Sequence, residues 1–349
     1  MTTFKSMHTA SSPATSSVGT VPDLSALLEP VALDIAASEE LLETNMIDDN
    51  PFVADLLTQV FQAGGKRIRP AITLLASRAT LPADRDFSRL HVILAVLTEL
   101  IHTASLVHDD VIDKASMRRG KETVNRKWND KLAVLLGDLL FAQASICLAR
   151  IMNPVIVGIY GQVLGDLCAG EIRQMRGQYS TEVNWDGYIR KSVGKTASLF
   201  AAASHSGAIL NGCSNEVIAS LKEYGLNFGI CFQIVDDLLD VTGSTKTMGK
   251  QAGSDLQSGV LTAPALFILE GQDGPAKRLK ELINSRAVNT DEGTADALAI
   301  IRENGGVEKT VELAHQYART AKDRLNVLHP SPYKDSLASL VDYVLTRTS

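Results

Sequence analysis

The sequence contains few aromatic residues and few cysteines, and both shortages narrow the choice of fold. Aromatic residues make up 5% of the 349 residues although 45% are hydrophobic, so Leu, Ala, Val and Ile must build the core. Such a composition is typical of helical proteins. No cysteine lies in a CxxC pair or in zinc-type spacing, so the four are predicted to be small buried residues: Cys147, Cys168, Cys213 and Cys231.

Long apolar runs and an excess of positive charge are also missing. The best run, LAVLLGDLLFA at 132–142, is interrupted by Asp138, whereas a membrane span needs about 18–20 apolar residues. The sequence therefore predicts no transmembrane segment. The net charge of -6 argues against a nucleic-acid-binding protein.

The first twenty residues lack acids, arginine and the apolar segment of a secretory signal, but ten of them are Ser or Thr. Residues 1–22 are therefore predicted to be a disordered tail, with a plastid transit remnant as the alternative. Residues 23–349 show no linker-like change in composition, so they are predicted to form a single domain.

Apolar residues recur at three- and four-residue spacing through most of the chain after Pro22, whereas strand-like alternation is almost absent. The sequence therefore predicts an all-α protein. Turn signals such as AGG at 63–65 and ENGG at 303–306 separate the helical stretches. The clearest predicted helices span 88–113, 130–150, 155–177, 215–241 and 295–326.

Two of these helices carry the same cluster of acids, D-D-x-x-D. Asp109 and Asp113 lie one turn apart on one helix face, where like charges destabilise a bare helix. A solvated surface explains one such cluster, but two copies beside apolar residues favour a shared role. If the two helices face each other, oxygen ligands of this kind suit Mg²⁺ that bridges to phosphate. The six acids are Asp109, Asp110, Asp113, Asp236, Asp237 and Asp240.

Cations occur in short islands that contain glycine, serine or threonine. The first island, GGKRIRP at 64–70, is suited to hold a diphosphate because arginine offers paired donors to phosphate oxygens. These islands in a net-acidic chain predict a compact polyanionic substrate that brings metal ions. Their polar members are Lys66, Arg67, Arg69, Arg118, Arg119, Lys195, Thr196, Lys250 and Asp255.

Five motifs, GGKRIRP, HDDVIDKASMRRG, GKTASLF, FQIVDDLLD and GKQAGSD, resemble in content and order those of the trans-isoprenyl diphosphate synthases. The resemblance covers about residues 25–345 and is greatest to long-chain members of the solanesyl and octaprenyl type. It implies an antiparallel helix bundle around a deep central cavity, assembled as a homodimer. It also implies head-to-tail condensation of isopentenyl diphosphate with an allylic diphosphate, farnesyl or geranylgeranyl.

The same resemblance implies a role for each motif residue. Asp109, Asp113 and Asp236 would bind two or three Mg²⁺ ions on the allylic diphosphate. Asp110, Asp237 and Asp240 would assist them, and Arg118 would contact that diphosphate. Isopentenyl diphosphate would be held by Lys66, Arg69, His102 and Arg119, although His102 alone could equally be a core histidine. The mouth of the site would be lined by Lys195, Thr196, Gln233 and Lys250. No side-chain base is assigned, since the departing diphosphate takes the proton in this family.

The size of the residues before Asp109 bears on product length. In this family that helix lines the cavity, and the residues four and five positions earlier, Ser105 and Ala104, are small. A prenyl tail could therefore pass to Leu100 and the turn below, with Phe141 as the predicted floor. This predicts a C30–C50 product, with C40–C45 favoured. A C20 product is the alternative if Leu100 closes the cavity, and Ala104 and Ser105 would then be packing residues.

Two other functions remain open at this stage. A terpene cyclase would share the first acid cluster but not DDLLD or GGKRIRP. A non-catalytic subunit of a heteromeric synthase would usually lose one cluster, and both are intact here. The predicted location is the cytoplasm, with the plastid as the alternative, and membrane contact is expected to be transient, during product release.

Overall fold

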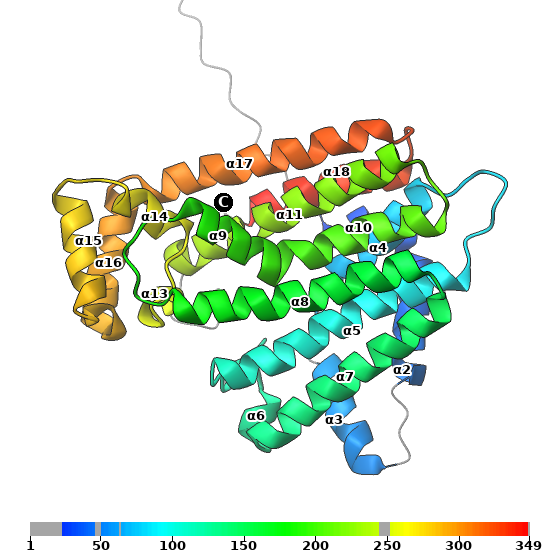
Figure 1. The fold of residues 1–349 in the computed structure, drawn as a ribbon, viewed down its shortest axis with the longest axis horizontal. Coiled ribbons are helices and arrows are strands. Elements are labelled where there is room, and N and C mark those ends of the chain that lie inside the picture. The colour runs from blue at the N-terminus through cyan, green and yellow to red at the C-terminus, as the bar shows by residue number, and fades with distance from the viewer. Residues whose placement is uncertain (1–22, 46–49, 63, 244–251, 348–349) are drawn as a thin grey trace, which may run out of the picture.

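The computed structural model describes residues 23–45, 50–62, 64–243 and 252–347, which form a helix bundle whose long helices run roughly alongside one another (Figure 1). The first half contains α1 (Leu24–Leu28), η1 (Glu29–Val31), α2 (Ala32–Asn45), α3 (Pro51–Gln62), α4 (Ile68–Ala79), α5 (Arg89–Ile112), β1 (Met117–Arg118), β2 (Lys121–Glu122), α6 (Val124–Lys127), α7 (Asp130–Ile151) and α8 (Pro154–Arg176).

The second half contains α9 (Trp185–Ser192), η2 (Val193–Ala197), α10 (Ser198–Leu210), α11 (Asn215–Thr242), α13 (Ser254–Gln257), α14 (Ala263–Leu269), α15 (Gly274–Asn284), η3 (Ala287–Asn289), α16 (Asp291–Glu303), α17 (Gly306–Arg324), η4 (Leu325–Val327) and α18 (Pro332–Thr346). The predicted all-α class is confirmed. The predicted disordered tail, residues 1–22, lies outside the described residues.

The ends of the long helices have local causes. Asn129 caps α7 by accepting a hydrogen bond from the Leu132 amide, and Ser214 caps α11 in the same way through Val217. The predicted helix 295–326 is instead two helices, α16 and α17. Gly305 separates them with φ +81°, a conformation that glycine adopts without strain. The ENGG turn signal therefore outweighs the apolar spacing on either side of it.

A short hairpin after α5 was not predicted. Its strands β1 and β2 pair in antiparallel fashion, with Arg118 opposite Lys121. The two residues between them, Arg119 and Gly120, have φ +50° and +77°, as in a type I′ turn. Strands of two residues are too short to give an alternating pattern in the sequence. The hairpin places two arginines beside the end of α5.

The interior consists of two packed clusters. One joins α4, α10 and α11 to the helices after residue 254, and the other joins α2 and α5 to α7 and α8. Close helix contact in the first cluster depends on small residues. A Cβ atom on Gly225 of α11 would lie 2.4 Å from the Phe200 carbonyl oxygen and 2.7 Å from the Ala201 Cα of α10. Glycine at this position lets the two helices approach.

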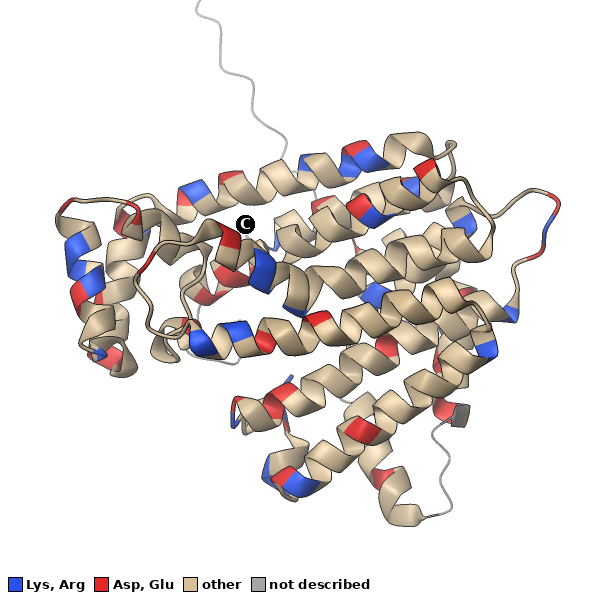
Figure 2. Ribbon diagram, in the orientation of Figure 1, with Lys and Arg blue, Asp and Glu red and all other residues tan. Residues whose placement is uncertain are grey.

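Helices α7 and α8 carry apolar side chains on the outside of the molecule. Most of both ribbons is uncharged in Figure 2. Leu135 on α7 is 62% exposed, and Val155 and Ile172 on α8 are each 59% exposed. By length and composition α5, α7 and α8 could each cross a membrane, with 72%, 33% and 22% of their most apolar windows buried in the chain. The absence of a transmembrane segment therefore stays a prediction.

The four cysteines are unpaired, and their burial differs from the prediction at one position. Cys147 and Cys231 are buried and Cys213 is half-buried, but Cys168 on α8 is exposed. The prediction of burial was wrong for Cys168 because the outward face of α8 is apolar, so its sequence looks like core.

Candidate active site

A cavity of about 1230 Å³ lies where the end of α5 approaches η2, α11 and the segment 254–262. Asp113 from the first acid cluster and Asp237 from the second both line it, together with Lys195 and Asp255. The two D-D-x-x-D motifs, more than a hundred residues apart in the sequence, therefore open onto the same space. This is the arrangement on which the sequence-based interpretation depends.

The first cluster points in two directions. Asp109 is partly buried, and Asp113 is the C-cap residue of α5. No donor among the described residues hydrogen-bonds to either side-chain carboxylate. Burial raises the pKa of Asp109 to about 6, and the nearby Lys195 ammonium only partly opposes this shift. A carboxylate in this environment is suited to receive a cation.

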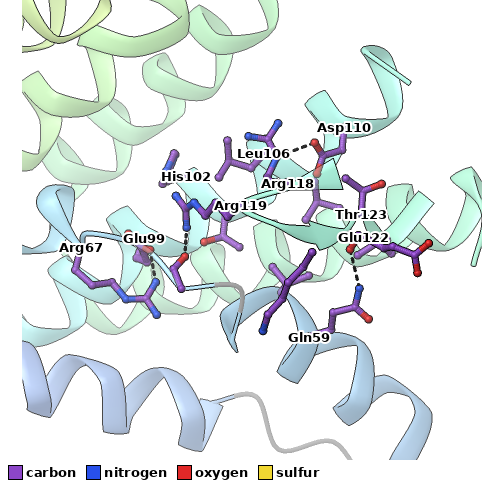
Figure 3. Close-up of a pocket in the computed structure, with 16 residues that line it drawn as sticks. Gln59, Arg67, Glu99, His102, Leu106, Asp110, Arg118, Arg119, Glu122 and Thr123 are labelled. Atoms are coloured by element: carbon purple, nitrogen blue, oxygen red, sulfur yellow. Dashed lines mark hydrogen bonds and ion pairs between the residues drawn. The ribbon is translucent and has the colours of Figure 1, made fainter. Parts of the chain in front are cut away.

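Asp110 is buried on another side of the helix. Its Oδ1 accepts a 2.7 Å hydrogen bond from Arg118 Nε, and both residues appear beside the smaller pocket in Figure 3. The structure therefore pairs Asp110 with the hairpin instead of with the cavity that Asp113 lines. Arg118, predicted to contact the allylic diphosphate, is held by this ion pair.

The second cluster is also divided between internal and open positions. Asp237 is 1% exposed and accepts hydrogen bonds from Tyr188 Oη at 2.6 Å and Gln233 Nε2 at 2.9 Å. Asp240 accepts hydrogen bonds from Ser254 Oγ and from backbone amides at the start of α13. Asp236 keeps a side chain that is 40% exposed. Of the three, Asp236 is the most accessible.

Asp255 adds a further acid to the cavity wall. Burial, together with the charges of Asp240 and Asp237, raises the pKa of Asp255 to about 7. A cation placed nearby would lower this pKa again. Lys250, in the same motif, lies outside the described residues.

A π-helical turn, η2, carries Lys195, which lines the cavity, and the adjacent Thr196, which is buried. Two glycines allow this turn to lie against α8, since a Cβ on Gly194 would come within 2.7 Å of the Asp166 carbonyl oxygen. A Cβ on Gly170 would come within 3.0 Å of the Lys195 amide nitrogen. Turns of this kind are frequent at functional sites.

Lys195 and Thr196 each have a partner from another helix. Lys195 Nζ lies 2.6 Å from Glu171 Oε2 on α8, and the Thr196 hydroxyl donates to Gln233 Oε1 at 2.6 Å. Glu171 lines the cavity and was missed from the sequence. A single Glu on a long helix gives no signal of its own until its partner is known.

A second, smaller cavity of about 60 Å³ lies between α3, α5 and the hairpin and is rich in cations (Figure 3). Arg119 donates a hydrogen bond to the Gly64 carbonyl, and Arg67 Nη1 lies 2.6 Å from Glu99 Oε1. Lys66 is exposed and lies over the Tyr343 ring, 5.1 Å from its centroid. The structure therefore brings the first and second basic islands together around this cavity.

His102 lines this cavity and contacts Arg69 of α4. Arg69 Nη1 donates to His102 Nε2 at 3.1 Å, and the guanidinium lies over the Phe200 ring. Burial and the nearby arginines lower the pKa of His102 well below its usual value, which keeps the ring neutral. Arg69 Nε is buried and has no partner among the described residues. Arg69 and His102 carry N–H donors and no carboxylate, so together they could bind an anion.

The donor set fits Mg²⁺ shared with a substrate. Among the described residues, no three His, Cys, Asp or Glu side chains lie close enough to hold one metal ion. Because fewer than three of these side chains can reach one ion, water and phosphate oxygens must complete its shell. Magnesium is usually bound in this way, by one or two carboxylates and substrate phosphates.

The residues predicted to set product length lie around the middle of α5. Ala104 is fully buried in the cluster that joins α5 to α7, and the Ser105 hydroxyl donates to the His102 carbonyl at 2.8 Å. Phe141 is half-buried, with its ring centroid 5.6 Å from that of His108. Phe141 therefore lies near the residue that precedes Asp109. Its assignment as the floor of the cavity stays a prediction.

An all-α bundle in which two aspartate clusters share a cavity beside a cationic pocket defines an isoprenoid synthase. Residues 50–301 match the family model for polyprenyl synthetase, and the chain belongs to that family. It is 41% identical over 326 residues to solanesyl-diphosphate synthase 2, chloroplastic, from rice (Oryza sativa subsp. japonica), which covers 93% of this chain and 80% of that protein.

Two crystal structures have the same fold. A decaprenyl diphosphate synthase from Rhodobacter capsulatus has a TM-score of 0.87 and 33% identity, covering 94% of this chain and 100% of its own. A polyprenyl synthase from Caulobacter crescentus, complexed with calcium and isoprenyl diphosphate, has a TM-score of 0.87 and 32% identity. The match covers 95% of this chain and 99% of the Caulobacter chain. The protein is a long-chain trans-polyprenyl diphosphate synthase. The comparisons do not favour a C20 product or a non-catalytic subunit.

Proposed function

We propose that this enzyme extends farnesyl or geranylgeranyl diphosphate with isopentenyl diphosphate to a C40–C45 all-trans product and requires Mg²⁺. The opening of both aspartate clusters onto one 1230 Å³ cavity is the observation that carries this proposal. The relative named for solanesyl diphosphate supports the long product, and the calcium complex of the Caulobacter enzyme supports a divalent ion.

Asp109, Asp113 and Asp236 are proposed to hold two or three Mg²⁺ ions. When bound, these ions would neutralise the charge that develops on the leaving diphosphate. Lys195, kept in place by Glu171, adds a fixed cation at the same wall. The Tyr188–Asp237 hydrogen bond joins α9 to α11, and the Gln233–Asp237 bond within α11 holds the same carboxylate, so the second cluster stays oriented.

The smaller cationic pocket is proposed to hold the diphosphate of isopentenyl diphosphate through Arg69, His102 and Arg119, with Lys66 at its edge. The allylic C–O bond then breaks, and the double bond of isopentenyl diphosphate attacks the allylic carbon to form the new C–C bond. A proton leaves the adjacent carbon, and the departed diphosphate accepts it. Apolar residues of α5 and α10 exclude water from the cation.

Product sizing tests the proposal directly. The enzyme is incubated with labelled isopentenyl diphosphate, farnesyl diphosphate and Mg²⁺, and the dephosphorylated alcohols are sized. We expect C40–C45 alcohols and no product when EDTA replaces Mg²⁺. Asp109→Ala or Asp236→Ala should lower turnover by orders of magnitude, whereas Asp296→Ala, an exposed change on α16, should not. A dominant C20 alcohol would refute the long-chain assignment.

We further propose that the exposed apolar faces of α7 and α8 form a homodimer interface. Such a face on a lone chain is otherwise a liability for aggregation. Leu135→Glu should shift the protein to monomers in light scattering, whereas Leu33→Glu, an equally apolar exposed position on α2, should leave the dimer intact. Monomeric wild-type protein would contradict this proposal.

The cytoplasm remains the proposed location, with the plastid as the alternative, and the chloroplastic rice relative supports the latter. Any contact with membranes is proposed to be transient and to accompany product release. Fractionation of source cells with organelle markers distinguishes these compartments.

A further inference from the structure

The end of α18 reaches the active site from a part of the chain that carries none of the five motifs. Arg347, the C-cap residue of α18, places Nη2 2.9 Å from Asp236 Oδ1. Its guanidinium also lies over the Phe232 ring of α11, 5.0 Å from the centroid. One turn earlier, Tyr343 lies under Lys66. The last turn of α18 therefore contacts both an acid cluster and a basic island.

Arg347 pairs with the acid of its cluster that is most open to a ligand. Asp237 and Asp240 have their oxygens engaged by donors within the fold, from Tyr188 and Ser254 among others. Asp236 is paired with the Arg347 guanidinium, and the Asp236 and Arg347 side chains are 40% and 25% exposed. A divalent ion bound at Asp236 Oδ1 would lie close to this guanidinium, and the two positive charges would repel each other.

We propose that Arg347 is the resident counter-cation of Asp236 in the substrate-free enzyme and that a divalent metal ion displaces it. The inference rests on the proposed metal role of Asp236. Metal binding then requires one ion pair and one ring contact to break. Before the metal binds, Arg347 compensates the negative charge of Asp236 beside Asp237.

The rest of α18 is anchored independently of Arg347, so a change there tests the ion pair and not the helix. Leu337, Leu340, Val341 and Val344 are buried in the larger core cluster. Lys322 of α17 also lies 2.5 Å from Asp342. Displacement therefore needs movement of one side chain at the helix end only.

The test is titration of the full-length enzyme with Mn²⁺ in the absence of any diphosphate, followed by calorimetry. Arg347→Gln should bind Mn²⁺ about two- to fivefold more tightly than wild type, because a partly exposed ion pair is worth up to about that factor. The matched control is Arg319→Gln, which removes the same charge from an exposed position on α17 and should leave the affinity unchanged.

The outcomes separate the inference from the proposed function. Equal or weaker Mn²⁺ binding by Arg347→Gln, with wild-type binding intact and lost in Asp236→Asn, would overturn the inference alone. An equal gain in Arg319→Gln would overturn it too, because the effect would then be one of net charge. No Mn²⁺ binding by either wild type or Arg347→Gln would overturn the inference, because an ion that needs a diphosphate to bind cannot displace Arg347 in the substrate-free enzyme. Product formation that persists in EDTA would overturn the proposed metal site.

Discussion

Replacing Asp109 by Asn should stabilise the metal-free enzyme while abolishing most of its activity. Burial in the folded protein raises the pKa of Asp109 from the ordinary 3.8 to about 6. The folded state therefore holds its proton more tightly than the unfolded chain does. Above pH 6 the folded protein must keep a charged carboxylate where a neutral group is preferred, and this lowers the free energy of unfolding.

The magnitude follows from the difference between these two pKa values. At 1.36 kcal/mol per pH unit, this pKa difference lowers the free energy of unfolding by at most about 3 kcal/mol. Partial exposure of Asp109 reduces the effect to roughly 1–3 kcal/mol. For a chain of this length, 1 kcal/mol changes the melting temperature by roughly 1.5 °C. Asn keeps the shape of the side chain and removes its charge, and Lys195 retains Glu171 as a partner.

The assay is thermal unfolding at pH 7.5 with EDTA, repeated at lower pH. We expect Asp109→Asn to melt roughly 2–4 °C above wild type at pH 7.5. The gain should shrink as the pH falls through 6 and disappear near 4, where the wild-type carboxyl is protonated. Asp296→Asn, whose side chain is 53% exposed, should change the melting temperature by less than about 1 °C. A variant no more stable than wild type at pH 7.5 would refute the reasoning.

Three further predictions concern packing, the second cluster and product length. Gly225→Ala should destabilise the protein by about 3 kcal/mol or more, measured by chemical unfolding, because its Cβ would overlap α10 backbone atoms; wild-type stability would contradict the close helix contact. Tyr188→Phe removes the 2.6 Å hydrogen bond to buried Asp237 and should cost roughly 1–3 kcal/mol in the same assay, whereas Tyr333→Phe, a partly exposed change, should cost little. Ala104→Phe should shorten the chromatographed alcohols with activity retained, and an unchanged product length would show that Ala104 does not face the prenyl tail.

Much of the site follows from local spacing. The three- and four-residue apolar repeats predict α5, α7, α8 and α11 to within one or two residues at each end. The repeated acid spacing also predicts that α5 and α11 contribute to one site, and Asp113 and Asp237 do line the same cavity. These features are encoded within single stretches of about twenty residues.

Which acids of each cluster are paired within the fold could not be predicted from the sequence. Asp110 and Asp113 look equivalent in the sequence, but Asp110 pairs with Arg118 on a hairpin whose strands are too short to give a pattern. Asp237 is likewise occupied by Tyr188, which lies 49 residues away in the chain. Such pairings depend on how helices pack, which periodicity along one helix does not specify.

The partners supplied by distant helices were missed for the same reason. The role of Glu171 could not be predicted because it depends on the close approach of Gly170 and Gly194, which places Lys195 beside it. Arg347 lies more than a hundred residues after Asp236 and belongs to no motif. A lone charged residue on an amphipathic helix looks like surface until the fold assigns it a neighbour.

The wide turn at Val193–Ala197 makes the active site sensitive to the length of the chain at one point. A π turn contains one residue more than the α-helical turn it replaces. Losing Ala197 would let α9 and α10 merge into one regular helix, rotating the residues of η2 before the deletion by about 100° relative to α10. The Lys195 ammonium would then turn away from Glu171 of α8, so one lost codon would disable the site without removing any of its chemical groups.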